Sequence, residues 1–219
     1  MNKICFIITS VISPWNDEPF GYSAKRTIYD AQQRYEQTLS TINSIRKYNG
    51  DDVTIWLLEG GKTIDTQEFE NCGVRVFNVS RIKYIKKAVM SNSKAWGEAS
   101  MMMYALPFMI KEKFDLFFKI SGRYSLNEHF DICQWSLTNI SGKDIYGDKQ
   151  ELSTRLFCIP KHQIFNFYKA LLSRWWKLKG SGTVYENYLV RHIGPENISW
   201  INPIGVEGKI GVSGKKVIE

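Results

Sequence analysis

Residues 115–124, with the sequence DLFFKISGRY, constrain the fold of this chain more than any other segment. A run of Leu, Phe, Phe and Ile is typical of a strand that is buried on both faces, as in a parallel sheet covered by helices. The apolar run then changes abruptly to Ser121, Gly122 and Arg123. Ligands of open α/β sheets bind just beyond the carboxyl ends of such strands. We therefore expect a ligand site at this strand end.

Apolar runs and helical periodicities alternate along the rest of the chain. Strands are predicted over 4–8, 53–58, 74–79, 115–120, 145–146, 155–159 and 198–201, and helices over 31–48, 94–111, 160–177 and 184–192. Pro107 should kink or break the second helix. The alternation predicts a three-layer α/β/α sandwich around a mostly parallel sheet. No linker divides the 219 residues, so we expect one domain, with disorder only in the tail at 214–216.

Composition restricts the partners and the compartment. The excess of 29 Lys and Arg over 22 Asp and Glu favours an anionic partner: a nucleotide, a nucleic acid or an acidic membrane. No RNA-recognition, zinc-finger or helix-turn-helix signature is present, so we expect no nucleic-acid partner. The four separated cysteines predict reduced thiols in a cytoplasm. The apolar run 4–8 is too short to span a membrane, which leaves at most a peripheral contact at its inner face.

Three segments, in a fixed order, resemble the nucleotide-binding half of GT-A glycosyltransferases, which transfer sugars from nucleotide donors. Residues 56–61 (WLLEGG) are similar to the second strand of that family, which ends in an acidic residue. Residues 92–106 are similar to its Lys/Arg-x-x-Gly helix, which precedes the strand that bears Asp-x-Asp. In this register Ser121-Gly122-Arg123 falls on the Asp-x-Asp position, and both acids are missing. The resemblance extends loosely to small enzymes of bacterial or viral surface-polysaccharide synthesis.

The resemblance implies a GT-A-like, Rossmann-related fold with a nucleotide-binding half at about 1–125 and an acceptor half with a C-terminal lid at about 126–219. It also implies a nucleotide-sugar donor, with a UDP-sugar as the first choice, and an oligosaccharide or lipid-linked acceptor. The leaving diphosphate gains negative charge, which metal enzymes offset with a carboxylate-held divalent ion. Arg123 replaces those acids here and can chelate phosphate oxygens. We therefore predict no cofactor and no metal site, with Mn²⁺ as the alternative.

The donor-binding residues are predicted around this strand end. Glu59 is expected to accept from the base or ribose, Lys94 to contact the nucleotide and Gly122 to permit close approach. The glycine-rich stretch 203–214 is expected to close on the diphosphate as a lid. The full set is Thr9, Ser10, Arg34, Glu59, Lys94, Glu98, Ser121, Gly122, Tyr124, Arg155, Lys209 and Ser213. An ordinary turn, solvated helix faces and a flexible tail are the alternatives.

Two residues are assigned catalytic roles, Arg123 at the leaving group and Glu186 as the base. An inverting transferase needs a carboxylate to take the proton of the acceptor hydroxyl. Glu186 is chosen because the resemblance places that base at the start of a helix late in the chain; stabilisation of the helix dipole is the alternative role. Asp148, Glu151 and Glu207 are the competing candidates.

Other interpretations remain open. The cluster 173–177 (SRWWK) suits stacking on acceptor sugars, contact with an anionic membrane, or burial of its Trp pair. A sugar nucleotidyltransferase is disfavoured, because such enzymes carry a Gly-rich, Arg-containing loop after the first strand. The corresponding loop here, 9–21, holds a single Gly. A non-catalytic nucleotide- or nucleic-acid-binding module is consistent with the positive charge and the missing acids.

Overall fold

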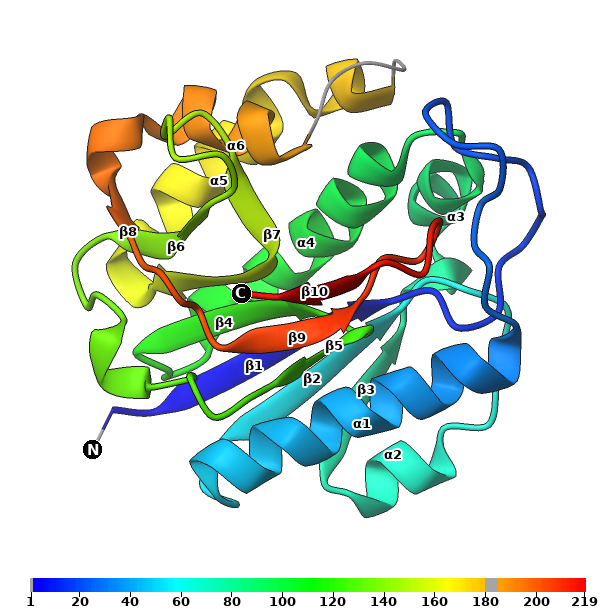
Figure 1. Cartoon of the computed structure of the whole chain (residues 1–219), viewed down its shortest axis with the longest axis horizontal. Coiled ribbons are helices and arrows are strands. Elements are labelled where there is room, and N and C mark those ends of the chain that lie inside the picture. The colour runs from blue at the N-terminus through cyan, green and yellow to red at the C-terminus, as the bar shows by residue number, and fades with distance from the viewer. Residues whose placement is uncertain (1, 180–184) are drawn as a thin grey trace.

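The computed structural model describes residues 2–179 and 185–219. Figure 1 shows a central sheet between two layers of helices. The sheet has seven strands in the order β3-β2-β1-β4-β7-β6-β8. They are β1 (Ile4–Ser10), β2 (Thr54–Glu59), β3 (Val74–Asn78), β4 (Leu116–Ser121), β6 (Ile140–Asp144), β7 (Leu152–Pro160) and β8 (Ile198–Trp200). All neighbours pair in parallel except β7, which is antiparallel to β4 and β6, so the predicted α/β sandwich with a mostly parallel sheet is confirmed.

Helices cover both faces because alternate residues of the central strands are apolar on each side. Phe6 of β1 and Phe118 of β4 pack in one core cluster, whereas Ile7 and Phe117 pack in the other. Helices α1 (Ala31–Asn49) and α2 (Gln67–Asn71) cover the first face. The second is covered by α3 (Lys83–Met90), α4 (Lys94–Lys111), α5 (Ile164–Arg174) and α6 (Tyr185–Ile193).

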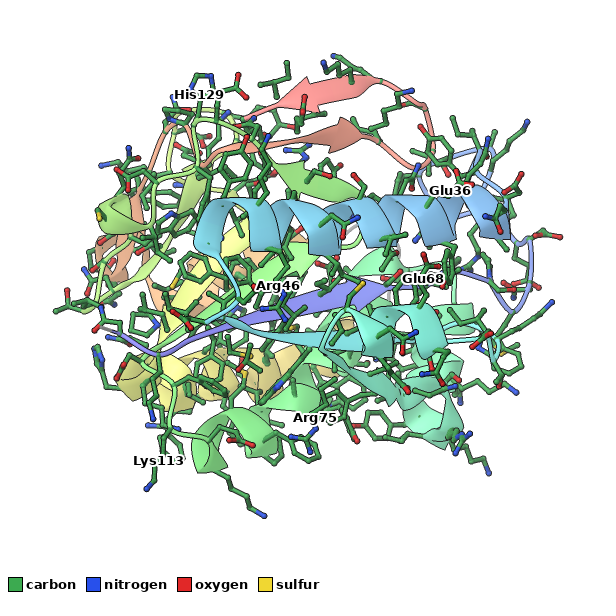
Figure 2. All side chains as sticks on the ribbon, turned by 90° about the horizontal axis from the view of Figure 1, so that it is seen from below. Glu36, Arg46, Glu68, Arg75, Lys113 and His129 are labelled. Carbon is green, nitrogen blue, oxygen red and sulfur yellow. The ribbon has the colours of Figure 1, made fainter. Side chains whose placement is uncertain are left out.

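Local chemistry fixes both ends of the first long helix. Asp30 caps α1: its carboxylate accepts from the Gln33 backbone N–H at 2.8 Å, and the Gln33 side chain accepts from the Asp30 N–H at 3.1 Å. At the other end Arg46, labelled in Figure 2, donates to the carbonyls of Asp51 and Val53 at 3.0 and 2.7 Å. The Arg46 contacts tie the last turns of α1 to the turn that leads into β2.

A second sheet lies beside α1. Its antiparallel strands, in the order β10-β9-β5, are β5 (Tyr124–Leu126), β9 (Val206–Lys209) and β10 (Lys216–Ile218). The Leu126 N–H of β5 donates to Ser44 Oγ of α1 at 2.9 Å, which anchors the sheet to that helix. Residues 203–214, expected as a lid or flexible tail, therefore form much of a β-hairpin, and the tail 214–216 expected to be disordered leads into β10.

Several predicted boundaries of helices and strands differ from those in the structure. Residues 145–146 follow β6 in a bend, and the helix predicted over 160–177 is divided into short 3-10 segments and α5. Pro107 does not end α4, which continues to Lys111; the proline is exposed, whereas Leu106 and Met109 are buried. Position 184, predicted to start a helix, lies outside the described residues. The 3-10 segments are η1 (Val79–Arg81), η2 (Ile132–Gln134), η3 (Lys161–Gln163), η4 (Trp175–Lys179) and η5 (Pro195–Asn197).

We predict that Gly205→Ala destabilises the protein far more than Gly147→Ala. Both glycines have positive φ, +73° and +86°, so each substitution costs about 1–2 kcal/mol of backbone strain. A Cβ at Gly205 would also overlap the backbone of Phe130, whereas none of the described atoms lies within 4 Å of a Cβ at Gly147. Overlap adds about 1–3 kcal/mol. Urea unfolding measures the difference; equal losses in the two variants would contradict this packing.

Candidate functional site

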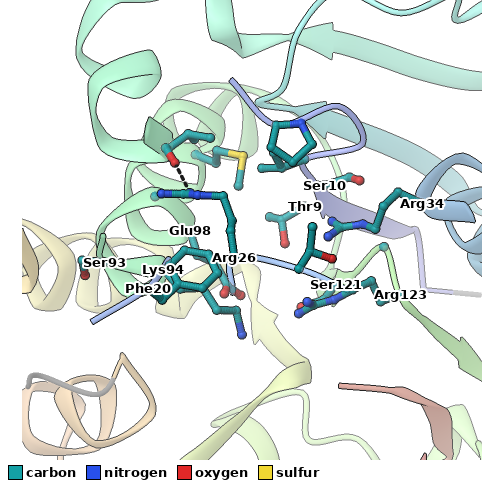
Figure 3. Close-up of a pocket in the computed structure, with 17 residues that line it drawn as sticks. Thr9, Ser10, Phe20, Arg26, Arg34, Ser93, Lys94, Glu98, Ser121 and Arg123 are labelled. Carbon is teal, nitrogen blue, oxygen red and sulfur yellow. Dashed lines mark hydrogen bonds between the residues drawn. The ribbon is translucent and has the colours of Figure 1, made fainter. Parts of the chain in front are cut away.

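A hollow opens beyond the carboxyl ends of β1 and β4, where the sequence predicts a ligand site (Figure 3). Its walls come from these strand ends, from the first turns of α1 and α4, and from the loop after β1. About 680 Å³ of empty space, part of it open to solvent, lies within it. The predicted residues that line it are Thr9, Ser10, Arg34, Lys94, Glu98, Ser121, Gly122 and Arg123.

A second hollow adjoins the first and holds about 550 Å³ of empty space. Phe20, Lys94, Ser121 and Arg123 line both, so the two hollows are parts of one site. The second hollow is completed by β7, by the first turn of α6 and by the turn of the β9–β10 hairpin. Its further predicted residues are Tyr124, Arg155 and Glu186.

Arg34 is a buried cation with an unsatisfied donor. Its side chain is on α1 and is 8 % exposed, and its Nε has no hydrogen-bond partner among the described residues. Burial, followed by repulsion from Arg123, lowers the pKa of Arg34 to about 9, although Glu59 partly offsets this. A buried donor without a partner is costly, and two cations side by side add to that cost. An anion between Arg34 and Arg123 would relieve both penalties.

Lys94 and Arg123 are the other available cations of the site. Within residues 2–179 and 185–219 neither takes part in an ion pair. Figure 3 shows Lys94 approaching from α4 and Arg123 from the opposite wall, on the side of Arg34. The Arg123 guanidinium lies against Gly211 of the hairpin turn, where a Cβ would overlap it. The hairpin therefore fixes the position of Arg123.

The carboxylate of the first hollow is already neutralised. Glu98 forms an ion pair with Lys119 Nζ, which also donates to Ser121 Oγ at 2.9 Å and to the Thr154 carbonyl. Burial raises the pKa of Glu98, but Lys119 and Lys94 more than offset this, so the pKa is lowered and Glu98 is ionised at neutral pH. The positive charge of Arg34, Lys94 and Arg123 is thus not cancelled by Glu98.

Glu186 is held in the second hollow by a hydrogen bond. Thr154 Oγ1 donates to Glu186 Oε1 at 2.7 Å, and the carbonyl of the same threonine accepts from Lys119. Thr154 and Lys119 therefore position the walls of both hollows. Neither was in the predicted set, although a single Lys within an apolar strand was a signal for a buried, paired cation. Arg26 was also missed; it donates to the Glu18 and Val89 carbonyls at 2.8 Å and stabilises the loop wall.

The competing carboxylates lie outside both hollows. Asp148 is exposed, and Glu207 forms a surface ion pair with Lys216 at 3.6 Å. Glu151 is half-buried; burial, then repulsion from Glu186 and two aspartates, raises its pKa. Of the four candidates, Glu186 alone among the described residues lines the site.

Some predicted donor-binding residues have other contacts. Glu59 Oε1 accepts from the backbone N–H groups of Ile12 and Gly61 at 2.9 and 2.7 Å, so this carboxylate shapes the loop and lines neither hollow. Burial raises its pKa. A Cβ at Gly122 would meet Thr38 Oγ1 at 3.1 Å, so this glycine serves close packing within the chain as well as lining the hollow.

Of the remaining predicted residues, Arg155 of β7 lines the site, whereas Lys209 and Ser213 of the β9–β10 hairpin line neither of the two hollows. Arg155 lines the second hollow, donates to the Tyr124 hydroxyl at 3.4 Å and pairs with Glu219 at 2.5 Å. Lys209 lines a third hollow beside α1, which Arg123 also lines. Ser213 is exposed in the hairpin turn and lines none of these hollows. The described residues contain no group of three or more His, Cys, Asp or Glu side chains that could hold a metal ion.

Comparison with known proteins gives a likeness in fold. No family profile and no curated protein sequence matches the chain. Among solved structures, the chain is similar to the apo glycosyltransferase GlyE of Streptococcus pneumoniae TIGR4, with a TM-score of 0.52 and 10 % identity over 92 % of this chain and 46 % of that one. It is also similar to the bifunctional glycosyltransferase WbbM, with a TM-score of 0.55 and 8 % identity over 91 % and 39 %. The chain spans less than half of either protein, and at this identity the likeness shows the fold alone.

We predict that Lys119→Met destabilises the protein by about 3–5 kcal/mol at neutral pH, because it leaves the Glu98 carboxylate buried and unpaired. The double variant with Glu98→Met should recover most of the loss. The pairing lowers the folded pKa of Glu98, so its stabilisation is present above the unfolded value and fades as the pH falls below about 4. Urea unfolding across pH measures this. A loss in Lys119→Met that does not change with pH would contradict the pairing.

Proposed function

We propose that this chain is a glycosyltransferase that moves a sugar from a nucleotide donor to a glycan or glycolipid acceptor. The observation that carries the proposal is one site whose two hollows share the cations Lys94 and Arg123, with the buried Arg34 in the first hollow and Glu186 in the second. The fold shared with GlyE and WbbM supports it.

In the proposed reaction the donor diphosphate lies in the first hollow, against Arg34, Lys94 and Arg123. Preorganised cations stabilise the negative charge that develops on the leaving oxygen, and a dry wall strengthens this effect. Arginine suits the role because its guanidinium stays charged and donates two parallel hydrogen bonds to phosphate. We propose that these side chains replace a carboxylate-held metal, so that transfer does not require Mn²⁺.

The proposed nucleobase position is the apolar wall of the first hollow, formed by Val11, Pro14, Val89 and Met101. A flat aromatic base buries apolar area there while its phosphates extend toward Arg123. A UDP-sugar is the proposed donor, in a pathway of surface-polysaccharide or glycoconjugate synthesis.

The acceptor is proposed to enter the second hollow and to present a hydroxyl to Glu186. The carboxylate takes the hydroxyl proton as the acceptor oxygen attacks the anomeric carbon, and the bond to the diphosphate breaks. Thr154 holds one carboxylate oxygen at 2.7 Å, which leaves Oε2 for the acceptor. Ser121, Arg123 and Lys94 line both hollows, so they border the proposed position of the transferred sugar.

We predict that Glu186→Gln lowers transfer at least about 100-fold while donor binding changes less than twofold, because a general base contributes about 10²–10⁴ to the rate. Release of nucleoside diphosphate from a panel of nucleotide sugars, with candidate acceptors, measures the rate. Glu207→Gln is the matched control, since that carboxylate is at the surface with Lys216 and lines neither hollow. Normal turnover of Glu186→Gln, or an equal loss in Glu207→Gln, would refute the assignment.

A further inference from the structure

Two basic clusters that are far apart in the sequence meet on one side of the molecule. The ring of Tyr84, in α3, lies 6.4 Å from the ring of Trp175, in η4, in an edge-on contact. Trp175 in turn stacks on Trp96 of α4, with centroids 6.0 Å apart. The contact between Tyr84 and Trp175 therefore joins the segments 81–87 and 175–179 into one surface, and stacking on Trp96 anchors that surface to α4.

The positive charge of the protein is concentrated in the two longer segments that contain these clusters. Residues 71–97 and 152–185 together contain 12 Lys and Arg and no Asp or Glu. The rest of the chain then has 17 basic residues against 22 acidic ones. The net charge of +7 therefore comes from these two segments, and the remainder of the protein is acidic overall.

We define the basic–aromatic face as Lys83, Tyr84, Lys87, Trp175, Lys177 and Lys179. The four lysines are exposed, Tyr84 is 42 % exposed and Trp175 is half-buried. α3 buries Ile85, Ala88 and Val89 on its inner side, so its cations point outward as in an amphipathic interfacial helix. Leu172, 36 % exposed on α5, is a further apolar side chain in the same layer.

This face borders the mouth of the site. Ser93, which lines the first hollow, donates through Oγ to the Leu178 carbonyl in η4. Val89, at the end of α3, lines the same hollow from its inner side. Lys86 Nζ lies 3.6 Å from the ring centroid of Trp15, in the loop that forms another wall. A planar partner on the basic–aromatic face would thus be next to the hollows.

We propose that the basic–aromatic face docks on a membrane surface rich in anionic phospholipid. Lysines near such a surface attract its headgroups while partly exposed aromatic rings enter the interface. None of the described helices is long and apolar enough to cross a bilayer. The docking itself does not depend on the proposed transferase activity. If the chain is a transferase, docking would also present a lipid-linked acceptor at the site, and this consequence rests on the proposed function.

Vesicle co-sedimentation tests the proposal on the whole chain, with phosphatidylcholine vesicles that contain or lack phosphatidylglycerol. We expect binding to the anionic vesicles alone, weakened by salt. The variant Lys83→Gln, Lys87→Gln, Lys177→Gln, Lys179→Gln should lose at least about tenfold in affinity. The matched control replaces four exposed lysines outside the face, Lys62, Lys113, Lys149 and Lys215, by Gln, and should lose much less.

The outcomes separate this proposal from its rivals. Equal losses in the two quadruple variants, or no binding to anionic vesicles, would overturn it. Binding to single-stranded RNA that depends on the same four lysines, without vesicle binding, would also overturn it and assign the face to nucleic acid. The vesicle assay contains no sugar donor or acceptor, so it does not depend on the proposed transferase activity. Vesicle binding can therefore fail while sugar transfer succeeds, or succeed while sugar transfer fails. The substituted lysines are exposed, so unchanged thermal unfolding verifies that the variants fold.

Discussion

The ion pair between Lys119 and Glu98 is the interaction on which the rest of the site depends. It joins the end of β4 to α4, and through the Thr154 carbonyl and Ser121 hydroxyl it also fixes β7. A lysine in the centre of a sheet is unfavourable unless each of its donors has a partner. Here the required partners come from three elements, so pairing the lysine also sets the spacing of the walls around both hollows.

This pairing determines the polarity of the site. Glu98 is neutralised by Lys119, whereas Arg34, Lys94 and Arg123 are without ion-pair partners among the described residues. The buried guanidinium of Arg34 has an Nε without a hydrogen-bond partner among those residues and is repelled by Arg123. A bound anion would relieve both penalties. In the second hollow the negative Glu186 is oriented by Thr154, the residue that also accepts from Lys119. One buried network thus places the carboxylate of Glu186 in a site that shares the cations Lys94 and Arg123 with the first hollow.

The long central elements were predictable from the sequence because local signals agree there. β1 and β4 are mostly apolar runs, with Lys119 as the one charged residue of β4, and α1 and α4 begin at side-chain caps, Asp30 and Ser93. The β9–β10 hairpin was missed because its strands are short and depend on β5, which is far away in the sequence. The positioning roles of Thr154 and Lys119 were not predictable because they come from contacts between residues distant in the sequence, Thr154 with Glu186 and Lys119 with Thr154. Arg123 and Glu186 were assigned from a resemblance in the order of segments, and the fold places both in one hollow.

The central claim, that unneutralised arginines bind the donor phosphates, is tested most directly by calorimetric titration of UDP in the presence of a chelator. The account predicts binding without metal, and a loss of about tenfold or more in Arg34→Met, the cost of one or more charged hydrogen bonds. Arg46→Met, at the other end of α1, should bind UDP as the unsubstituted protein does. Binding that appears only with Mn²⁺, or equal affinity in Arg34→Met and Arg46→Met, would contradict it.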